Sequence, residues 1–141
     1  MSIRFTIPLE PVGQMRPRLS THGGFAKAYK AGKQKLAEDQ LLALAVQHRP
    51  ETPLEGPLCL TVDAYMAIPK SFSKAKRSMA LSGDLRPAKK PDASNVAKHL
   101  EDCFNGIFWR DDAQIVGLLV RKFYSDRPRW EIEIKPTGGT Q

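Results

Sequence analysis

Cysteine is scarce in this sequence and histidine is scattered. Only two cysteines, Cys59 and Cys103, occur among 141 residues, and both lie in apolar stretches. Two thiols are too few for a disulfide framework or a four-thiolate zinc site, so we expect free, buried thiols. His22, His48 and His99 show no metal-ligand spacing and are interpreted as structural or solvated.

Long apolar runs and the motifs of nucleotide-dependent enzymes are also missing. The uncharged run Gln40–His48 is far shorter than the roughly 20 apolar residues of a membrane helix. The first eight residues alternate like a strand and lack the apolar region of a signal peptide, so we expect a cytoplasmic protein. Because no glycine-rich phosphate loop, nucleophile elbow or Cys/His constellation is present, ATP use and covalent nucleophilic catalysis are not expected.

Acidic residues are outnumbered, with 15 Asp and Glu against 22 Lys and Arg, which gives a formal net charge of +7. Such an excess suits a polyanionic partner. Residues 4–35 and 70–98 carry seven and eight basic residues, and a group of acids follows: Asp92, Glu101, Asp102, Asp111 and Asp112. Since carboxylates oppose phosphate binding, this group indicates either a divalent metal site or unrelated surface acids beside a solvated basic face.

Length predicts a single domain over residues 1–141. Alternating apolar residues predict strands at 3–7, 58–66, 115–124 and 130–134. Helical spacing predicts one helix over 33–48 and another that follows Asp92 as its N-cap and ends before Asn105. We expect loops over 8–29 and 70–90; the second is basic and mobile, and residues 73–81 within it have the pattern of a short helix.

The helix after Asp92 has a polar side on which Asn95, Lys98 and Asp102 fall together. Taken alone, Asp92 is explained as an N-cap, and Lys98 with Asp102 as a surface ion pair. The functional alternative is that carboxylates here hold Mg²⁺ while Lys98 contacts a phosphate oxygen or stabilises a leaving group. The pair Asp111-Asp112 is weak evidence alone, because paired acids are common in turns.

Three separated motifs follow one another along the chain. They are Lys90-Pro-Asp-Ala-Ser-Asn-Val-Ala-Lys98, Glu101-Asp102-Cys-Phe-Asn-Gly106 and Asp111-Asp-Ala-Gln-Ile115. The opening Phe5-Thr-Ile-Pro8 with Pro11-Val-Gly-Gln-Met-Arg-Pro-Arg18 precedes them. In this order the motifs resemble the RusA family of Holliday junction resolvases, and the resemblance covers residues 3 to about 134.

The resemblance implies a small α/β fold of the α+β type, with a mixed β-sheet of about four strands and two main helices, acting as a homodimer. It also implies paired symmetric nicking of four-way DNA junctions during phage or prophage recombination and repair, with Mg²⁺ as cofactor and Mn²⁺ as a substitute. Matched position by position, Asp92 and Asp112 correspond to metal-binding catalytic carboxylates and Lys98 to the catalytic lysine. Asp102 and Asp111 match further acids of the motifs.

One position departs from the family pattern: Ser94 stands where the family usually has a second acid. A hydroxyl is a poorer Mg²⁺ ligand than a carboxylate, so metal affinity should fall. Three outcomes follow: Ser94 holds a metal-bound water, Asp111 or Asp102 compensates, or the protein binds junctions without cutting them. A non-catalytic junction-binding protein is therefore the main alternative, and a basic nucleic-acid-binding module with structural acids is a third.

We expect the basic residues near the motifs and in the 70–90 segment to contact DNA phosphates. They are Arg16, Arg18, Lys74, Lys76, Arg77, Lys89 and Lys90. Phe72 either wedges at the junction branch point or anchors its segment to the core. A two-fold junction requires two equivalent sites, so we expect a dimer whose interface draws on apolar residues such as Leu118, Val120, Trp109 and Trp130.

Overall fold

The computed structural model describes residues 2–13 and 24–138, in which four strands form one sheet. In chain order these are β1 (Ile3–Ile7), β2 (Leu58–Ala67), β3 (Ile115–Ser125) and β4 (Arg129–Pro136), and in space the order is β1-β4-β2-β3. β4 pairs antiparallel with β1 and β2, whereas β3 pairs parallel with β2. The expected mixed four-stranded sheet and α+β fold are thus confirmed.

Helix α1 (Gly24–Ala45) begins earlier than the sequence predicts. The expected loop through residue 29 is wrong for its last six residues, because the alanines and lysines after Gly24 are strong helix formers. The helix ends at Ala45, where a 3₁₀ turn, η1 (Val46–His48), leads toward Pro50. None of the described helices is both long and apolar enough to cross a membrane.

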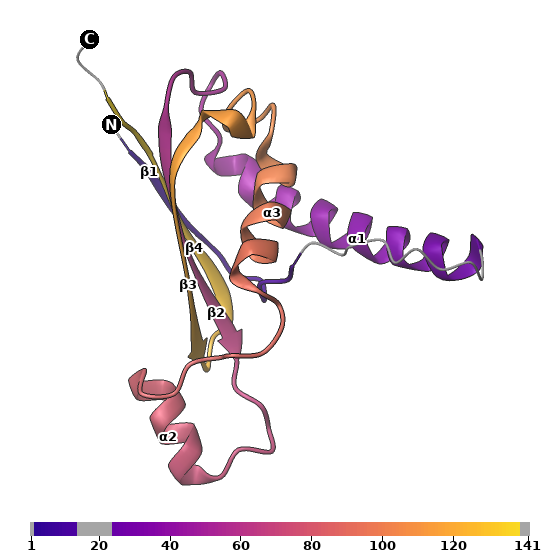
Figure 1. The fold of residues 1–141 in the computed structure, drawn as a ribbon, viewed down its shortest axis with the longest axis vertical. Helices are drawn as coiled ribbons and strands as arrows, with labels where there is room; N and C mark the ends of the chain where they lie inside the picture. Colours follow the sequence, from indigo (N-terminus) through magenta and orange to yellow (C-terminus); the bar gives the residue numbers. More distant parts are fainter. Residues whose placement is uncertain (1, 14–23, 139–141) are drawn as a thin grey trace.

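Helix α2 (Lys74–Ser82) occupies the middle of the segment expected to be a loop. The Ser73 hydroxyl accepts a hydrogen bond from the Lys76 N–H at 3.1 Å, which caps its first turn. Gly83 ends the helix with a φ of 90°, a conformation that favours glycine. The short helix is therefore confirmed and the continuous loop over 70–90 is wrong. Figure 1 shows α2 beyond one end of the sheet.

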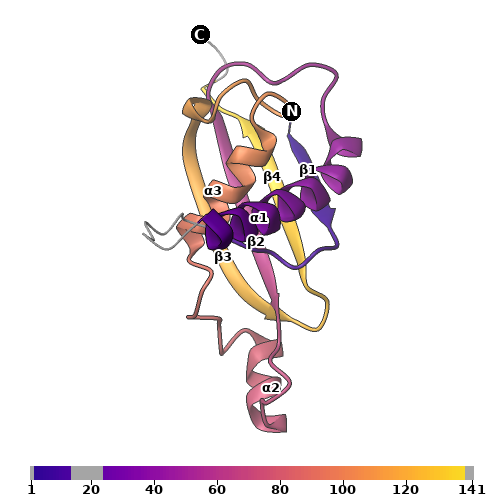
Figure 2. The same ribbon diagram turned by 90° about the vertical axis from the view of Figure 1, so that its right-hand side faces the viewer.

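Helix α3 (Ala93–Phe104) and α1 lie against the same face of the sheet, with α3 over the half that contains β3 (Figures 1 and 2). Between α3 and the sheet lies an apolar core. The sheet contributes alternate residues of β2, β4 and β1, and α3 contributes its apolar side. The fully buried members include Ile7, Leu58, Val62, Ile134, Val96, Leu100 and Phe104.

The two tryptophans are part of this core. Trp109 and Trp130 have no exposed surface, and the Trp109 indole N–H donates to the Asn105 side-chain oxygen at 2.6 Å. Burial of large aromatic side chains contributes strongly to folding stability, and both rings pack between the sheet and the helices. The prediction that these residues remain available for a dimer interface is wrong. Leu118 is still half exposed, and Val120 is partly buried.

Candidate active site

Asp92 stands at the N-cap position of α3, but its carboxylate does not cap the helix. Its backbone is extended (φ −67°, ψ 147°), and its carbonyl accepts the Val96 N–H at 3.0 Å. The side chain is exposed and makes no hydrogen bond to the first turn. The N-cap explanation therefore accounts for the backbone at Asp92 and leaves the carboxylate free to bind something else.

Lys98 joins carboxylates from two separate segments of the chain. Its ammonium lies 3.3 Å from Asp102 Oδ1, one turn further along α3, and 3.8 Å from Asp112 Oδ2, at the start of the turn η2 (Asp112–Gln114). The expected i,i+4 ion pair is thus present, and a tertiary contact is added to it. The hydrogen bond from Lys98 to Asp102, the charge of Asp102 and that of Asp112 raise the pKa of Lys98. Lys98 is accordingly an ammonium at neutral pH.

Gln114 holds Asp112 in place by fixing the turn that carries it. Its side-chain oxygen accepts hydrogen bonds from the N–H groups of Arg110 (2.8 Å) and Asp111 (3.1 Å). Its side-chain nitrogen donates to the carbonyls of Leu54 (2.9 Å) and Gly56 (3.0 Å). Sequence reasoning quoted Gln114 within a motif but gave it no role. Its position two residues after Asp112 was the available indication that it belongs to the same turn.

Glu101 is a further acid of this cluster; sequence reasoning counted it among the grouped acids but gave it no individual role. Burial raises its pKa first, and the negative charges of Asp112 and Asp102 raise it further, while Lys98 lowers it. At about 100° per residue, Glu101 shares one side of α3 with Lys98 and Ser94. The spacing 94, 98 and 101 along a predicted helix was a usable signal. Asp111 is exposed and makes no ion pair within the described residues.

The donor atoms of this cluster are those that Mg²⁺ prefers. Mg²⁺ is commonly held by one or two carboxylates, with waters and substrate phosphate completing its shell. Asp112, Asp102 and Glu101 supply carboxylates, and Lys98 offsets only part of their charge. Across residues 2–13 and 24–138, no three His, Cys, Asp or Glu side chains are grouped so as to hold a metal by themselves. Within the part of the chain that the structure describes, these carboxylates therefore do not form a complete metal site.

The segment that leads into Asp92 is tied to the sheet. The Lys122 ammonium, on β3, donates to the carbonyls of Lys89 (2.8 Å) and Pro91 (2.9 Å). On the other side, Gly13 packs so closely that a Cβ there would lie 2.8 Å from Pro91 Cβ and 3.1 Å from Asn95 Cβ. The N-terminal segment thus meets the start of α3, and this explains a glycine at position 13.

The expected DNA-contacting residues lie in several places. Lys74, Lys76 and Arg77 are exposed on α2, and Lys89 and Lys90 are exposed before α3. Arg16 and Arg18 lie outside the described residues. Phe72 is partly buried: its ring meets Tyr124 edge-on at 5.6 Å between centroids, and the Lys76 ammonium lies 4.4 Å above it. These contacts favour the anchoring explanation of Phe72 over the wedge.

The remaining titratable groups near α3 are structural. His99 is fully buried, its Nδ1 lies 2.8 Å from Gln34 Nε2, and burial lowers its pKa. Cys103 is a buried free thiol whose pKa burial raises to about 12, so it does not act as a nucleophile at neutral pH. Cys59 is a free thiol, partly buried. His48 stacks on Phe5 at 4.8 Å.

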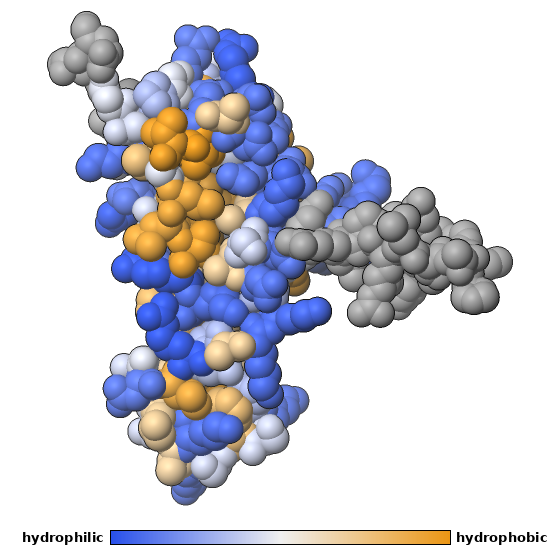
Figure 3. All heavy atoms as spheres, viewed as in Figure 1, coloured by the Kyte–Doolittle hydropathy of each residue, from blue (hydrophilic) through white to orange (hydrophobic). Residues whose placement is uncertain are grey.

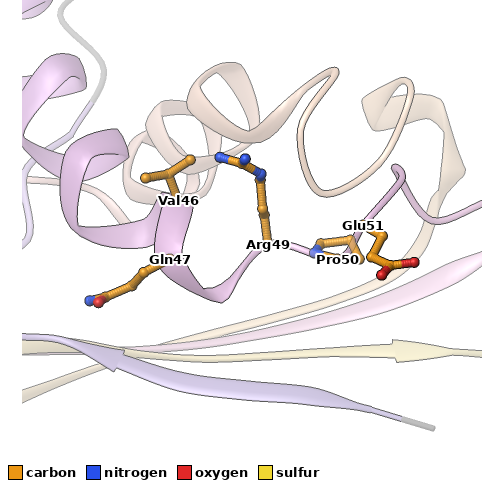
Figure 4. A pocket seen from close by; sticks show the side chains of 5 residues that line it. All are labelled: Val46, Gln47, Arg49, Pro50 and Glu51. Carbon is orange, nitrogen blue, oxygen red and sulfur yellow. The ribbon is translucent and has the colours of Figure 1, made fainter.

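A surface hollow of about 460 Å³ lies beside η1, away from this cluster. It is lined by Val46, Gln47, Arg49, Pro50 and Glu51. Figure 4 shows the Gln47 and Glu51 side chains pointing away from each other, so the charged and polar groups do not converge on a common point. None of the candidate site residues lines this hollow.

Comparison with known proteins agrees with this placement of motifs. The family model described as endodeoxyribonuclease RusA matches residues 8–135. The protein named "Uncharacterized protein YqaN" of Bacillus subtilis (strain 168) is 42% identical over 135 residues, covering 94% of this chain and 95% of that protein. The chain belongs to the RusA endodeoxyribonuclease family.

Proposed function

We propose that this protein is a Mg²⁺-dependent, structure-selective endonuclease that resolves four-way DNA junctions by paired symmetric nicks. The observation that carries the proposal is Lys98, held by carboxylates of α3 and η2 on an exposed helix face. A junction nuclease of the RusA family needs such a cation beside metal-binding acids. The reaction belongs in the cytoplasm, where free thiols such as Cys59 and Cys103 persist.

Each residue of the cluster has a distinct role in hydrolysis. Lys98 keeps its proton and offers a point charge to a non-bridging phosphate oxygen or to the leaving oxygen. Asp112 and Asp92 are the proposed metal ligands, with Asp102 and Glu101 adding negative charge beside them. A bound Mg²⁺ supplies charge neutralisation at the phosphate. Asp102 also holds the Lys98 ammonium in position, with its Oδ1 3.3 Å away.

Exposed basic side chains account for affinity toward DNA that does not depend on the DNA sequence. Lys74, Lys76 and Arg77 on α2, and Lys89 and Lys90 before Asp92, are exposed and available for phosphates. Lysines and arginines that neutralise phosphates release counterions, which favours binding to any DNA of suitable shape. Selectivity for a four-way junction then follows from how two sites are spaced, and a homodimer provides two equivalent sites.

Ser94 favours a second candidate, a junction-binding protein that does not cut. Ser94 is exposed and lies on the same side of α3 as Lys98 and Glu101. An acid at position 94 would lie on this same side of α3. With serine there instead, the proposed metal site has one negative charge fewer. Glu101 is close enough to Asp112 for the charge of Asp112 to raise its pKa, and Asp102 shares the Lys98 ammonium with Asp112, which supports the cutting enzyme as the first candidate.

The test is cleavage of a labelled synthetic four-way junction beside linear duplex, with Mg²⁺ or Mn²⁺. The variants are wild type, Asp92→Asn and Ser94→Asp. Paired nicks in the junction alone, abolished by Asp92→Asn, are the expected result. Tight junction binding without nicks, with nicking gained by Ser94→Asp, would instead establish the non-catalytic candidate. Equal binding to junction and linear duplex without nicks would leave only a basic nucleic-acid-binding module.

A further inference from the structure

The segment between α2 and α3, residues 83–91, is held in place by hydrogen bonds more than by burial. Within it Pro87 is buried and Leu85 and Pro91 are half-buried, while the other side chains are exposed. In Figure 1 the segment passes between the end of the sheet and α2, and Figure 3 shows hydrophilic side chains across that level of the molecule. Because segments with few buried apolar contacts open easily, its position depends on the groups that bind its backbone.

Lys122 of β3 supplies two of these hydrogen bonds. It pairs in register with the fully buried Ala64 of β2, so its side chain leaves the face of the sheet that the helices cover. Its ammonium donates to the carbonyls of Lys89 at 2.8 Å and Pro91 at 2.9 Å. A third connection runs in the other direction, from the Arg86 guanidinium to the Lys122 carbonyl at 2.9 Å. Residue 122 thus binds the segment through both its side chain and its backbone.

The hydrogen bond to the Pro91 carbonyl reaches Asp92 through one rigid group. The Pro91 carbonyl and the nitrogen and Cα of Asp92 belong to a single planar peptide unit. On the other side, the Asp92 carbonyl accepts the Val96 N–H at 3.0 Å. The backbone of Asp92 is therefore held from both sides, and rotation within its own side chain is what remains to place the carboxylate.

The contacts of Lys122 are not those of an ion pair or of a phosphate ligand. Among the described residues it makes no ion pair with a carboxylate. Two of the three N–H donors of its ammonium are taken by carbonyl groups. Lys89 and Lys90 are exposed and are better placed to meet phosphates. The contacts therefore assign Lys122 a role within the protein.

We propose that Lys122 is a positioning residue for junction nicking: by binding the Lys89 and Pro91 carbonyls, it sets where Asp92 presents its carboxylate. The inference rests on the proposed function, in which Asp92 acts on the DNA. Lys122 itself touches neither the DNA nor the reacting atoms. Since a misplacement of about 1 Å can cost about 100-fold in rate, loss of Lys122 should lower the rate of nicking and leave affinity for the junction unchanged.

The test compares wild type with Lys122→Met, Lys122→Arg and the matched control Arg121→Met. Arg121 precedes Lys122 on β3, and its guanidinium donates to both carboxylate oxygens of Asp63, at 2.7 and 2.9 Å. The control therefore also loses two side-chain hydrogen bonds from one residue of the same strand, on the opposite face of the sheet. Nicking rates over a range of junction concentrations give kcat and KM for each protein.

Lys122→Met should lower kcat by about 100-fold with KM unchanged. Lys122→Arg should recover most of the rate, because a guanidinium also donates to two carbonyls, and Arg121→Met should nick like wild type. A raised KM with unchanged kcat would make Lys122 a DNA contact instead. Equal losses of kcat in Lys122→Met and Arg121→Met would make it a contributor to general stability. Either result would overturn the proposal.

Amide hydrogen exchange at Val96 tests the same contact without any need for nicking. Because the Asp92 carbonyl binds this N–H, Lys122→Met should speed its exchange on the order of 10-fold, and Arg121→Met should leave it unchanged. If Lys122→Met folds poorly, Lys122→Gln, which keeps an N–H donor, takes its place. Unchanged exchange at Val96 would contradict the positioning role. A wild type that does not nick would contradict the proposed function, while faster exchange in the Lys122 variant alone would still support the hold of Lys122 on Asp92.

Discussion

Lys98 touches two carboxylates that lie apart in the sequence, and only one of these contacts follows from helix geometry. The contact with Asp102 is the ordinary spacing of residues i and i+4, and an exposed ion pair of this kind adds little stability by itself. The contact with Asp112 exists because Gln114 fixes η2 against residues 54–56. An ordinary surface ion pair does not require a lysine to contact acids from two separate elements. This arrangement is the reason for proposing that Lys98 takes part in the reaction.

Glu101 gives the site a measurable pH signature. Its pKa is raised in the folded protein above the ordinary value of 4.5, so the folded state binds a proton more readily than the unfolded state. The charged carboxylate therefore costs stability at pH above the raised pKa, and this cost disappears as pH falls to about the unfolded value. Glu101→Gln should be more stable than wild type at pH 8 and gain nothing near pH 4, as measured by denaturant unfolding. An equal gain at both pH values would contradict this electrostatic account.

Among the elements, α3 is where sequence reasoning went furthest. Its apolar spacing and the positions of Asp92 and Lys98 along it followed from helical periodicity, which is local. The proposed roles of Asp92 and Lys98 came only from the resemblance of the motifs to the family. The neighbours that α3 acquires were not, since Asp112, Gly13 and Lys122 reach it from segments that periodicity cannot connect. Helix α1 was predicted too short for a different reason: the glycines at 23 and 24 suggested a loop, and the alanines and lysines that follow outweigh them.

Substitution by alanine is predicted to have opposite effects on stability at Gly13 and at Gly32. Gly13→Ala places a Cβ against Pro91 and Asn95 at distances below van der Waals contact, so it should destabilise the protein by about 1–3 kcal/mol. Gly32→Ala, in α1 with no atom within 4 Å of the new Cβ, should stabilise by up to about 1 kcal/mol. Thermal unfolding of both variants checks the pair. A neutral Gly13→Ala would show that the N-terminal segment does not pack on α3 in solution.

Helix α2 is predicted to contribute affinity for DNA rather than catalysis. Replacing Lys74, Lys76 and Arg77 with alanine should weaken junction binding and flatten its dependence on salt. The log–log slope should fall by close to one unit for each phosphate that the variant no longer neutralises. The measurement is junction binding over a range of salt concentrations. Since Lys76 also lies over Phe72, thermal unfolding of the variant serves as the control for folding. An unchanged slope would remove α2 from the DNA-binding surface.

The whole molecule combines a strongly basic surface with one apolar sheet edge. Its four strands and its +7 charge followed from alternation and composition, whereas the single domain stays a prediction from length. The strand order did not, because it depends on pairings between residues far apart, such as Val62 with Val120. That order determines which apolar residues are buried. It puts both tryptophans in the core and leaves Val116, Leu118 and Leu119 on the free edge of β3.

The central claim, that this protein nicks junctions using the cluster around Lys98, is tested most directly by mapping nicks on both strand pairs of a four-way junction. The proteins compared are wild type, Lys98→Met and Lys35→Met; Lys35 is a matched control because it also pairs with an aspartate at i+4 and is exposed. We predict symmetric nicks with wild type and Lys35→Met, and a rate about 100- to 1000-fold lower with Lys98→Met at unchanged junction affinity. Undiminished nicking by Lys98→Met, or nicks on one strand only, would contradict the account.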